Sequence, residues 1–549
     1  MLTDIQNALD EWFNLELERI RSDSPASAAA AADKLAAIEA RLIALADASG
    51  RGKATRPQFV PSGTRAASNA NPRFIIVGAG VGGLCMGALL EEAGFNNFVI
   101  LEKASAIGGT WHQNTYPGVA CDVNSYLYQF SFLKNYSWSS SFPRGREIHA
   151  YLLEVANHFN LKDRIQLNRR VTTCVYRQGK WVVQTDAGED LTADVLISAV
   201  GFLHYPSIPT FEGLQDFAGP AFHSSRWNDT VVVKGKRVGI VGNGSSAVQI
   251  VPAIASDASA LAVFQRTAQW IFPAPRFSYS AQRIAMLSRY PELVERLYDH
   301  YMEWYNVAFG NAVVGDEHEK QFFRTACEGN LARISDPALR AKLTPPYPVM
   351  CKRLVLGDGY YEAFMSGKAA LVTEPITRIE REGIRTSDGN LHKLDVIVLA
   401  TGFKTHEYCR QLNISVSGGV SLAEAWKDGA ATLDSVAVAG IPNFFILGGP
   451  YSTIGNLSTM TCTEFQVRYI LGLIREMCDR GATSIAARAA AQNAFVEEMQ
   501  EAASKTVWLE GCKSWYLDPN GRVDIWTKSA YAFVDKMLAG PDKNNYHFQ

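Results

Sequence analysis

Short apolar runs alternate with longer mixed segments through the middle of the chain. Two of these runs, FIIV and RVGIV, are each followed by a glycine-rich turn and then by a helix-forming segment. A second apolar run follows in each unit, FVILEK in the first and LAVFQRT in the second. This order predicts two strand–helix–strand units, and therefore an α/β fold with two Rossmann-like dinucleotide-binding domains.

A further pair of similar runs ends the two units. LTADVLISAVGF stands before residue 205, and KLDVIVLATGF stands at 393–403. The glycine after each run lets the backbone approach a bound cofactor. We therefore expect a first domain over 71–205 that resumes at 395–549 with a C-terminal segment. The second domain is expected at 206–394, inserted in the first, with a helical insertion at about 280–340.

The start of the chain has a different pattern. ALDEWFNLELERI places apolar residues at helical spacing, and SAAAAADKLAAIEARLIALA consists of strong helix formers. Residues 1–70 are thus predicted to be a helical extension followed by a linker over roughly 51–72. The extension matches no catalytic motif, so we expect a packing or oligomerisation helix pair, through which a homo-oligomer could form.

The two turns carry the residues that a dinucleotide fold needs. The first glycine makes the turn, the second admits the pyrophosphate, and the third lets the helix pack on the strand. These residues are Gly78, Gly80 and Gly83 in the first unit, and Gly242, Gly244 and Ala247, with Ser245 and Ser246 between them, in the second.

One difference between the units assigns their cofactors. At the same offset from the first glycine, the first unit has Glu102 and the second has Arg266, followed by Thr267. A carboxylate accepts both hydrogens of a ribose diol, whereas a cation matches a 2′-phosphate. The sequence therefore predicts that the first domain binds FAD through Glu102 and that the second selects NADPH through Arg266.

Composition narrows the remaining classes. The 549 residues carry a net charge of −2 without basic blocks, so nothing suggests a nucleic acid partner. The uncharged stretch 435–463 contains Pro442 and Pro450, which favours a strand and a turn over a transmembrane segment. Nine scattered cysteines without a CxxC pair argue for a reducing cytosol and against a redox dithiol or metal site. The polar, acidic start is unlike a secretory signal, and we expect a cytoplasmic protein.

A segment between the two units resembles a known family. FAGPAFHSSRWN places Phe217, Gly219, His223 and Trp227 on the F-x-G-x-x-x-H-x-x-x-W fingerprint of Baeyer-Villiger monooxygenases, although Asn228 stands where the family usually has Pro or Asp. The N-terminal extension is similar to that of the hydroxyacetophenone monooxygenase branch. The resemblance covers most of residues 73–530.

The resemblance implies further site residues. GGTWHQNTYPGVACDVNSYLYQFSF looks like a second FAD segment, with Ala120 where many relatives carry Arg, and YPVMCKRLVLGDGYY looks like the active-site lysine–arginine segment. The residues carried over are Thr110, Trp111, Asp122, Tyr128 and Val171 for FAD, Lys352 and Arg353 for the active site, and Trp508, with Trp515 as a rival, beside the nicotinamide.

The family's chemistry gives these residues roles. The resemblance implies that FAD, reduced by NADPH, reacts with O2 to a flavin peroxide that converts a ketone to an ester or lactone. A fixed cation must stabilise the anion, and Arg353, held by Asp122, suits this because a guanidinium does not give up its proton. Lys352 is expected to be a second cation for the 2′-phosphate. His223 is expected to organise the linker between the domains rather than to transfer protons.

Three alternatives stay open. A flavin monooxygenase that oxygenates nitrogen or sulfur carries a close variant of the fingerprint. A pyridine-nucleotide disulfide reductase also has paired folds, but it needs a cysteine pair near the flavin, and Cys85 and Cys121 are far apart in sequence. A non-enzymatic flavin-binding protein could use the N-terminal helices as a partner surface. Aromatic residues in the insertion, such as Tyr305 and Phe309, are more typical of core than of a substrate pocket.

Overall fold

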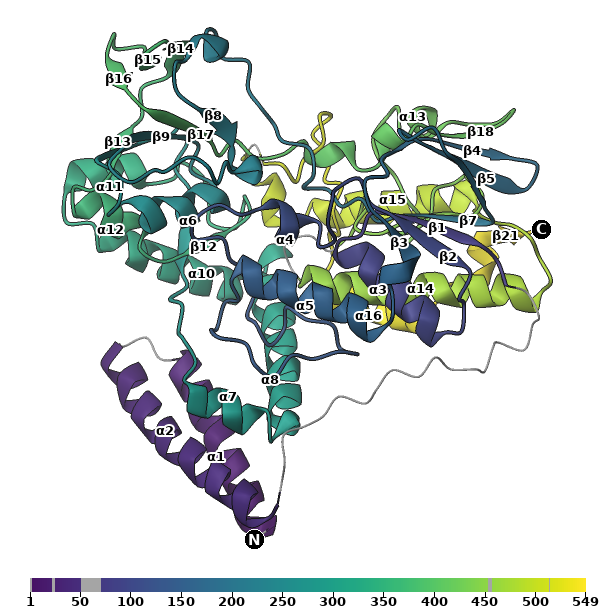
Figure 1. Cartoon of the computed structure of the whole chain (residues 1–549), viewed down its shortest axis with the longest axis horizontal. Coiled ribbons are helices and arrows are strands. Elements are labelled where there is room, and N and C mark those ends of the chain that lie inside the picture. The colour runs from purple at the N-terminus through teal and green to yellow at the C-terminus, as the bar shows by residue number, and fades with distance from the viewer. Residues whose placement is uncertain (1, 22–24, 51–70, 453–456, 513) are drawn as a thin grey trace.

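The computed structural model describes residues 2–21, 25–50, 71–452, 457–512 and 514–549. Two parallel five-stranded sheets organise the chain, and helices pack against both (Figure 1). The predicted α/β class with two Rossmann-like domains is confirmed. No described helix is long and apolar enough to cross a membrane.

The first sheet has the strand order β19-β7-β1-β2-β3, and every neighbouring pair is parallel. Its strands are β1 (Phe74–Val77), β2 (Phe98–Leu101), β3 (Ile165–Gln166), β7 (Val195–Ser198) and β19 (Phe444–Ile446). Helices α3 (Val81–Glu92), α5 (Gly145–His158), α14 (Thr459–Asp479) and α16 (Ala530–Ala539) lie on one side of it (Figure 1). Because β19 follows the second sheet in the chain, the polypeptide returns to the first domain as expected.

The second sheet has the order β13-β10-β9-β17-β8 and is also entirely parallel. Its strands are β8 (Ala221–His223), β9 (Arg237–Val241), β10 (Ala260–Phe264), β13 (Ala370–Val372) and β17 (Val396–Leu399), with α6 (Ser245–Ile254) and α12 (Tyr360–Met365) packed beside them. Strand β17 belongs to this sheet, so the chain leaves it after Leu399 and not at residue 394 as the sequence suggested.

Smaller elements complete the domains. The strands are β4 (Val171–Arg177), β5 (Lys180–Thr185), β6 (Asp190–Ala193) and β18 (Ile414–Val416) in one sheet, β14 (Ile376–Glu380), β15 (Gly383–Thr386) and β16 (Leu391–Lys393) in another, and the pairs β11 (Ile271–Pro273) with β12 (Val355–Gly357) and β20 (Ile485–Ala487) with β21 (Tyr546–Phe548). The short helices α4 (Thr110–Gln113) and α13 (Leu422–Ala425) and the longer α15 (Ala489–Ala503) connect them.

The insertion is helical, as the sequence predicted. It comprises α7 (Ala281–Leu287), α8 (Pro291–Trp304), a π-helical turn (Tyr305–Phe309), α9 (Gly310–Val313), α10 (Glu317–Ala332) and α11 (Pro337–Leu343). The π-helical turn places Tyr305 and Phe309, 6% and 5% exposed, beside the first domain. π-Helical turns are rare and often occur at functional sites.

The N-terminal extension is a helical hairpin of α1 (Leu2–Arg21) and α2 (Pro25–Ala48) that packs on α7 (Figure 1). Trp12 and Leu42 are fully buried there, and the Tyr290 hydroxyl donates to the Leu42 carbonyl at 2.9 Å. Most of the predicted linker, 51–70, lies outside the described residues. The hairpin therefore packs within its own chain, against the insertion.

A buried ion network fixes this hairpin. Arg283 of α7 donates to both carboxylate oxygens of Glu16, at 3.0 and 2.8 Å, and Arg19 does so at 2.9 and 2.7 Å. Burial alone would raise the pKa of Glu16, but the two guanidiniums outweigh it and lower the pKa to about 2. The α1–α7 contact thus includes a carboxylate that stays ionised far from water.

Two of the nine cysteines form a disulfide, although the sequence, which has no CxxC pair, argued against a redox dithiol. Cys351 and Cys512 are 161 residues apart in sequence, and their Cα atoms are 6.1 Å apart. Tertiary structure brings them together, which spacing along the chain does not reveal. The other seven cysteines are buried thiols.

Candidate active site

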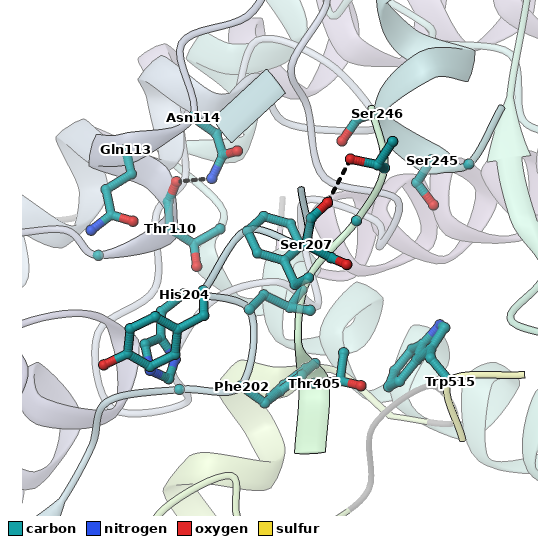
Figure 2. A pocket seen from close by; sticks show the side chains of 18 of the residues that line it. Thr110, Gln113, Asn114, Phe202, His204, Ser207, Ser245, Ser246, Thr405 and Trp515 are labelled. Atoms are coloured by element: carbon teal, nitrogen blue, oxygen red, sulfur yellow. Dashed lines mark hydrogen bonds between the residues drawn. The ribbon is translucent and has the colours of Figure 1, made fainter. Parts of the chain in front are cut away.

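One cavity of about 1390 Å³ lies where the glycine turns of both nucleotide folds meet (Figure 2). Figure 2 shows Thr110 and Asn114 on one side of it and Ser245 and Ser246 on another. Sixteen of the predicted site residues line it: Gly78, Gly80, Glu102, Thr110, Trp111, Asp122, Tyr128, Val171, Gly242, Gly244, Ser245, Ser246, Arg266, Thr267, Lys352 and Arg353. The structure thus brings both predicted cofactor sites into one space.

The two turns have the same local geometry. Gly78 and Gly242 have φ of 108° and 110°, a region that side chains other than glycine rarely adopt. A Cβ at Gly78 would lie 2.6 Å from the Ala199 carbonyl oxygen, and one at Gly242 would lie 2.3 Å from that of Ala400. Each first glycine therefore packs against the carbonyl that follows the closing strand of its own unit.

The helix that follows each turn points its N-terminus at the cavity. Gly80 and Gly244 are the N-caps of α3 and α6, and neither helix receives a side-chain cap. A Cβ at Gly244 would have no heavy atom within 4 Å, so the turn is open toward the cavity. Free backbone N–H groups beside open space fit the pyrophosphate of a dinucleotide. Gly83 and Ala247 are buried where each helix packs on its strands, and they do not line the cavity.

Glu102 stands at the end of β2 with its carboxylate already oriented. One oxygen accepts from the Ala79 N–H at 2.7 Å and the other from the Ala104 N–H at 2.8 Å. Each carboxylate oxygen has two lone pairs, so one acceptor position on each remains for a ribose diol. The residue fits the role that the sequence predicted.

The second FAD segment is held by hydrogen bonds between aromatic side chains. The Trp111 indole N–H donates to the Tyr128 hydroxyl at 3.1 Å, and the Thr459 hydroxyl donates to the same oxygen at 3.2 Å. Val171, 5% exposed, begins β4 on the wall near Glu102. These contacts join the start of α14 to the segment after α4, and so close the cavity with residues from both parts of the first domain.

Arg266 and Lys352 form a pair of cations in the part of the cavity wall that the second fold supplies. Burial and then the nearby Arg266 charge lower the pKa of Lys352, whose ammonium lies 4.4 Å from the centre of the Tyr347 ring. Among the described residues, neither cation is paired with a carboxylate. Two unneutralised cations side by side in a cavity wall fit an anionic ligand group such as a 2′-phosphate.

Arg353 reaches the cavity from the segment after α11. Its Nη2 donates to Oδ2 of Asp122 at 2.8 Å. The Asp122 charge is the main cause that raises the pKa of Arg353 above its ordinary range, and the nearby Tyr516 side chain is a further cause. The Tyr305 hydroxyl in turn donates to the Asp122 carbonyl at 3.2 Å. Arg353 is thus a fixed, permanently charged donor.

The structure separates the two candidate tryptophans. Trp515 lines the large cavity and stacks on Phe202, with ring centres 6.0 Å apart (Figure 2). Trp508 is 1% exposed and lines a small neighbouring cavity with Arg353, Tyr305, Phe309 and Tyr516. Geometry therefore favours Trp515 over Trp508 beside the nicotinamide, in contrast to the order that the sequence suggested.

The fingerprint residues stand outside the cavity wall. The Ser225 N–H donates to His223 Nδ1 at 3.1 Å, which leaves Nε2 to donate to the Gly402 carbonyl at 2.9 Å. A Cβ at Gly219 would lie 2.3 Å from the Asp395 carbonyl oxygen, Phe217 is 8% exposed, and Trp227 packs edge-on against Phe222. Because both ring nitrogens are engaged in the linker, we retain an organising role for His223.

Sequence reasoning missed three residues. Gln249 of α6 accepts from the Ala120 N–H at 3.3 Å and donates to the Ala120 carbonyl at 3.0 Å, in place of a side-chain contact from residue 120. Asn243 donates to Gln265 and to the Thr267 carbonyl, each at 2.8 Å, and fixes the second turn. Tyr516 supports Arg353. Only Asn243 had a local signal, because it lies inside the glycine turn.

Comparisons with known proteins agree with this geometry. Residues 75–330 match the family described as pyridine nucleotide-disulphide oxidoreductase. An uncharacterized monooxygenase of Mycobacterium tuberculosis is 40% identical over 83% of this chain and 92% of its own length. A Baeyer-Villiger monooxygenase of Streptomyces coelicolor is 36% identical over 84% of this chain and 90% of its own length.

Solved structures extend the likeness to the fold. Steroid monooxygenase bound to NADP has a TM-score of 0.78 at 30% identity, over 87% of this chain and 99% of that one. The OTEMO complex with FAD and NADP has a TM-score of 0.79 at 27% identity, over 88% of this chain and 100% of that one. Cys351 and Cys512, which form the disulfide, do not line the large cavity, and the two cysteines that do line it, Cys121 and Cys462, are buried thiols. The chain belongs to the Baeyer-Villiger monooxygenase family.

Proposed function

We propose that this protein is an FAD- and NADPH-dependent monooxygenase that converts ketones to esters or lactones with O2. One observation carries the proposal: Arg353, paired with Asp122, lines the same cavity as the glycine turns of both nucleotide folds. A permanent cation therefore faces the space where the two cofactors would meet. The relatives crystallised with FAD and NADP support the same cofactors here.

The residues of this chain supply binding and electrostatics. When bound, FAD accepts a hydride from NADPH and activates O2. Gly78, Gly80 and Glu102 hold the flavin dinucleotide. Arg353 stabilises negative charge on the reacting oxygen atoms, and it keeps its own proton because guanidinium is a very weak acid. Asp122 and Tyr516 orient Arg353, so little reorganisation is needed during reaction.

The second fold determines the coenzyme. Gly242 and Gly244 hold the pyrophosphate, while Arg266 and Lys352 bind the 2′-phosphate that distinguishes NADPH from NADH. Trp515, which lines the large cavity with Phe202 stacked on it, would contact the nicotinamide. This assignment replaces Trp508 in that role.

The other classes fit less well. Attack on a ketone carbonyl places negative charge on its oxygen, which the cation of the Asp122–Arg353 pair can stabilise, and this pair therefore favours ketone oxygenation over oxygenation of nitrogen or sulfur. A purely structural flavin protein would not need the Arg266 and Lys352 pair. The hydroxyacetophenone branch stays a prediction that rests on the N-terminal extension.

Two further properties are proposals. Seven buried free thiols support a cytoplasmic location, where thiols stay reduced. The outer face of α2 exposes Ala36, Ala40 and Ala44, small residues on which a second copy could pack, and this supports a homo-oligomer. Light scattering of the purified protein would give the mass of the assembly.

Activity on ketones tests the main proposal. The purified yellow protein should consume NADPH and form esters or lactones when it is screened with cyclic, aryl and long-chain ketones. If ketones give no ester while amines or sulfides are oxygenated, the alternative monooxygenase is correct.

A further inference from the structure

The segment that carries Trp508, Cys512, Trp515 and Tyr516, here called the clamp segment, is joined to the arginine segment at two points. The disulfide links Cys512 to Cys351, two residues before Arg353, and the Tyr516 side chain lines the same small cavity as the Arg353 guanidinium. Trp508 and Tyr516 pack together with ring centres 5.0 Å apart. The disulfide therefore holds the supports of Arg353 in place.

We propose that Cys351 and Cys512 form a thiol–disulfide exchange site that controls how firmly the clamp segment positions Arg353. The proposal rests on the proposed function only for its catalytic readout. Neither cysteine belongs to the family's glycine turns or fingerprint, and both lie outside the large cavity. The site would react with a small dithiol in one direction and with hydrogen peroxide in the other.

Position along the chain makes exchange feasible at Cys512. Cys351 is completely buried, whereas Cys512 is 7% exposed and follows the exposed residues Leu509, Glu510 and Gly511. Gly511 has a φ of 90°, so the chain turns sharply just before the disulfide. A short movement of this turn would present the Cys512 sulfur to a reductant. Attack is then directed to one of the two sulfurs.

The electrons and protons of the exchange balance between the two cysteines and the reductant or oxidant, and no metal or flavin is needed. A dithiol's thiolate attacks the Cys512 sulfur, Cys351 leaves as a thiolate and takes a proton, and the reductant's second thiol then displaces Cys512. The products are two protein thiols and one cyclic disulfide. In reverse, hydrogen peroxide oxidises one thiol to a sulfenic acid, and the other thiol displaces water to restore the disulfide.

The expected consequence is a feedback on coupling, which is the fraction of oxidised NADPH that yields ester. In the reduced protein the clamp segment is tethered only by non-covalent contacts, so Tyr516 leaves Arg353 more often. Loss of a polar contact of about 1.4 kcal/mol to a charged group lowers a rate by roughly tenfold. More NADPH would then be oxidised with release of hydrogen peroxide and without ester. That peroxide would close the disulfide and restore coupling.

The test uses the full-length, FAD-loaded protein before and after treatment with dithiothreitol. Non-reducing peptide mapping should show a Cys351–Cys512 peptide pair that dithiothreitol removes. Reduction should increase proteolytic cleavage at Leu509–Gly511 and raise peroxide release per NADPH by roughly tenfold. The rate of anaerobic flavin reduction by NADPH should stay the same, which separates loss of positioning from general loosening.

Variants locate the effect. Cys512→Ala should behave like the reduced protein and ignore dithiothreitol, and Cys351→Ala gives an independent version should the first variant fold poorly. Tyr516→Phe should lower coupling in the oxidised state and reduce the further effect of dithiothreitol, because both act on Arg353. Cys174→Ala, at a buried free thiol in β4, should keep the full response.

Either of two results would overturn the proposal. An air-oxidised protein without the Cys351–Cys512 peptide pair, or a Cys512→Ala variant with unchanged proteolysis and peroxide release, would exclude the exchange site. If no sample forms an ester while mapping and proteolysis respond as described, the exchange site stands and the proposed function fails.

Discussion

The side-chain amide of Gln249 bonds both backbone groups of Ala120, accepting from its N–H at 3.3 Å and donating to its carbonyl at 3.0 Å. Gln249 lies on α6 of the second fold, and Ala120 lies in the FAD segment two residues before Asp122. The Tyr116 hydroxyl also donates to Gln249, at 3.1 Å. This amide therefore ties the coenzyme domain to the segment that holds Arg353.

Replacing Gln249 with Leu should weaken this tie. The Ala120 N–H and carbonyl would lose their partner, at a cost of about 1 to 3 kcal/mol in stability. We expect fewer ester molecules per NADPH, with FAD content retained, since the phosphate turns are untouched. Gln321→Leu, at an exposed position on α10, is the matched control and should stay within about 0.5 kcal/mol of the parent. Unchanged coupling in Gln249→Leu would restrict the residue to a purely structural role.

Removing the Arg353 guanidinium should abolish ester formation. One preorganised donor to a developing anion typically contributes on the order of a hundredfold to a thousandfold in rate. Arg353→Ala should still bind FAD and be reduced by NADPH, and NADPH oxidation should then release hydrogen peroxide. Arg353→Lys should rescue poorly, because an ammonium lacks the planar fork of the guanidinium that bonds Asp122. Ester formation by Arg353→Ala near the parent rate would place the oxygenation site elsewhere.

Coenzyme choice should depend on the cation pair. Arg266→Ala should raise the KM for NADPH by roughly tenfold or more, because a charge-assisted contact of about 1.5 to 3 kcal/mol is lost. The KM for NADH should change little. Lys352→Ala should act in the same direction. Steady-state kinetics with both coenzymes give the comparison. Equal losses for NADPH and NADH would remove Arg266 from the specificity role.

Docking of the N-terminal hairpin should depend on Glu16 and Arg283. Arg283→Met should lower the free energy of unfolding by about 3 to 5 kcal/mol, because it leaves a carboxylate buried without its main partner. The control is Arg41→Met, which breaks an ion pair with Glu11 whose side chains are both more than half exposed and should cost less than about 1 kcal/mol. Urea unfolding followed by fluorescence measures both.

The same network predicts an acid dependence. The folded pKa of Glu16, about 2, is below its ordinary value of 4.5. Its contribution to stability is therefore complete above about pH 4.5 and is lost as the pH falls toward 2. Glu39 acts in the opposite sense, because burial raises its pKa. Glu16→Gln should flatten the loss of stability below pH 4.5, and an unchanged slope would contradict this assignment.

Local patterns predicted most of the fold and pointed to the candidate cofactor residues. The turns at Gly78 and Gly242, the partners Glu102 and Arg266, and the helical insertion were all readable because each depends on residues close together in the chain. The boundary near residue 394 was placed too early, because the last strand of the second sheet looks like the end of either domain. Residues such as Asp122 and Arg353 came from the family resemblance, not from spacing.

Contacts between distant segments were not predictable. The disulfide joins Cys351 and Cys512 across 161 residues of sequence, and Gln249 bonds Ala120 across the domain junction. Nothing in the neighbouring sequence marks these residues or Tyr516. The choice between Trp508 and Trp515 depends on packing for the same reason, since both stand in similar aromatic surroundings and only the structure shows that Trp515 lines the large cavity.

The hairpin of α1 and α2 has a consequence for shortened chains. It shares buried ionic and apolar contacts with α7 and α8, where Tyr290 and Arg283 bond Leu42 and Glu16. A chain that begins near residue 71 would expose this surface, including a guanidinium without its carboxylate, and should form aggregates on expression. Residues 1–50 supplied as a separate peptide should re-cover it and restore a monodisperse protein, so the hairpin would behave as a removable subunit.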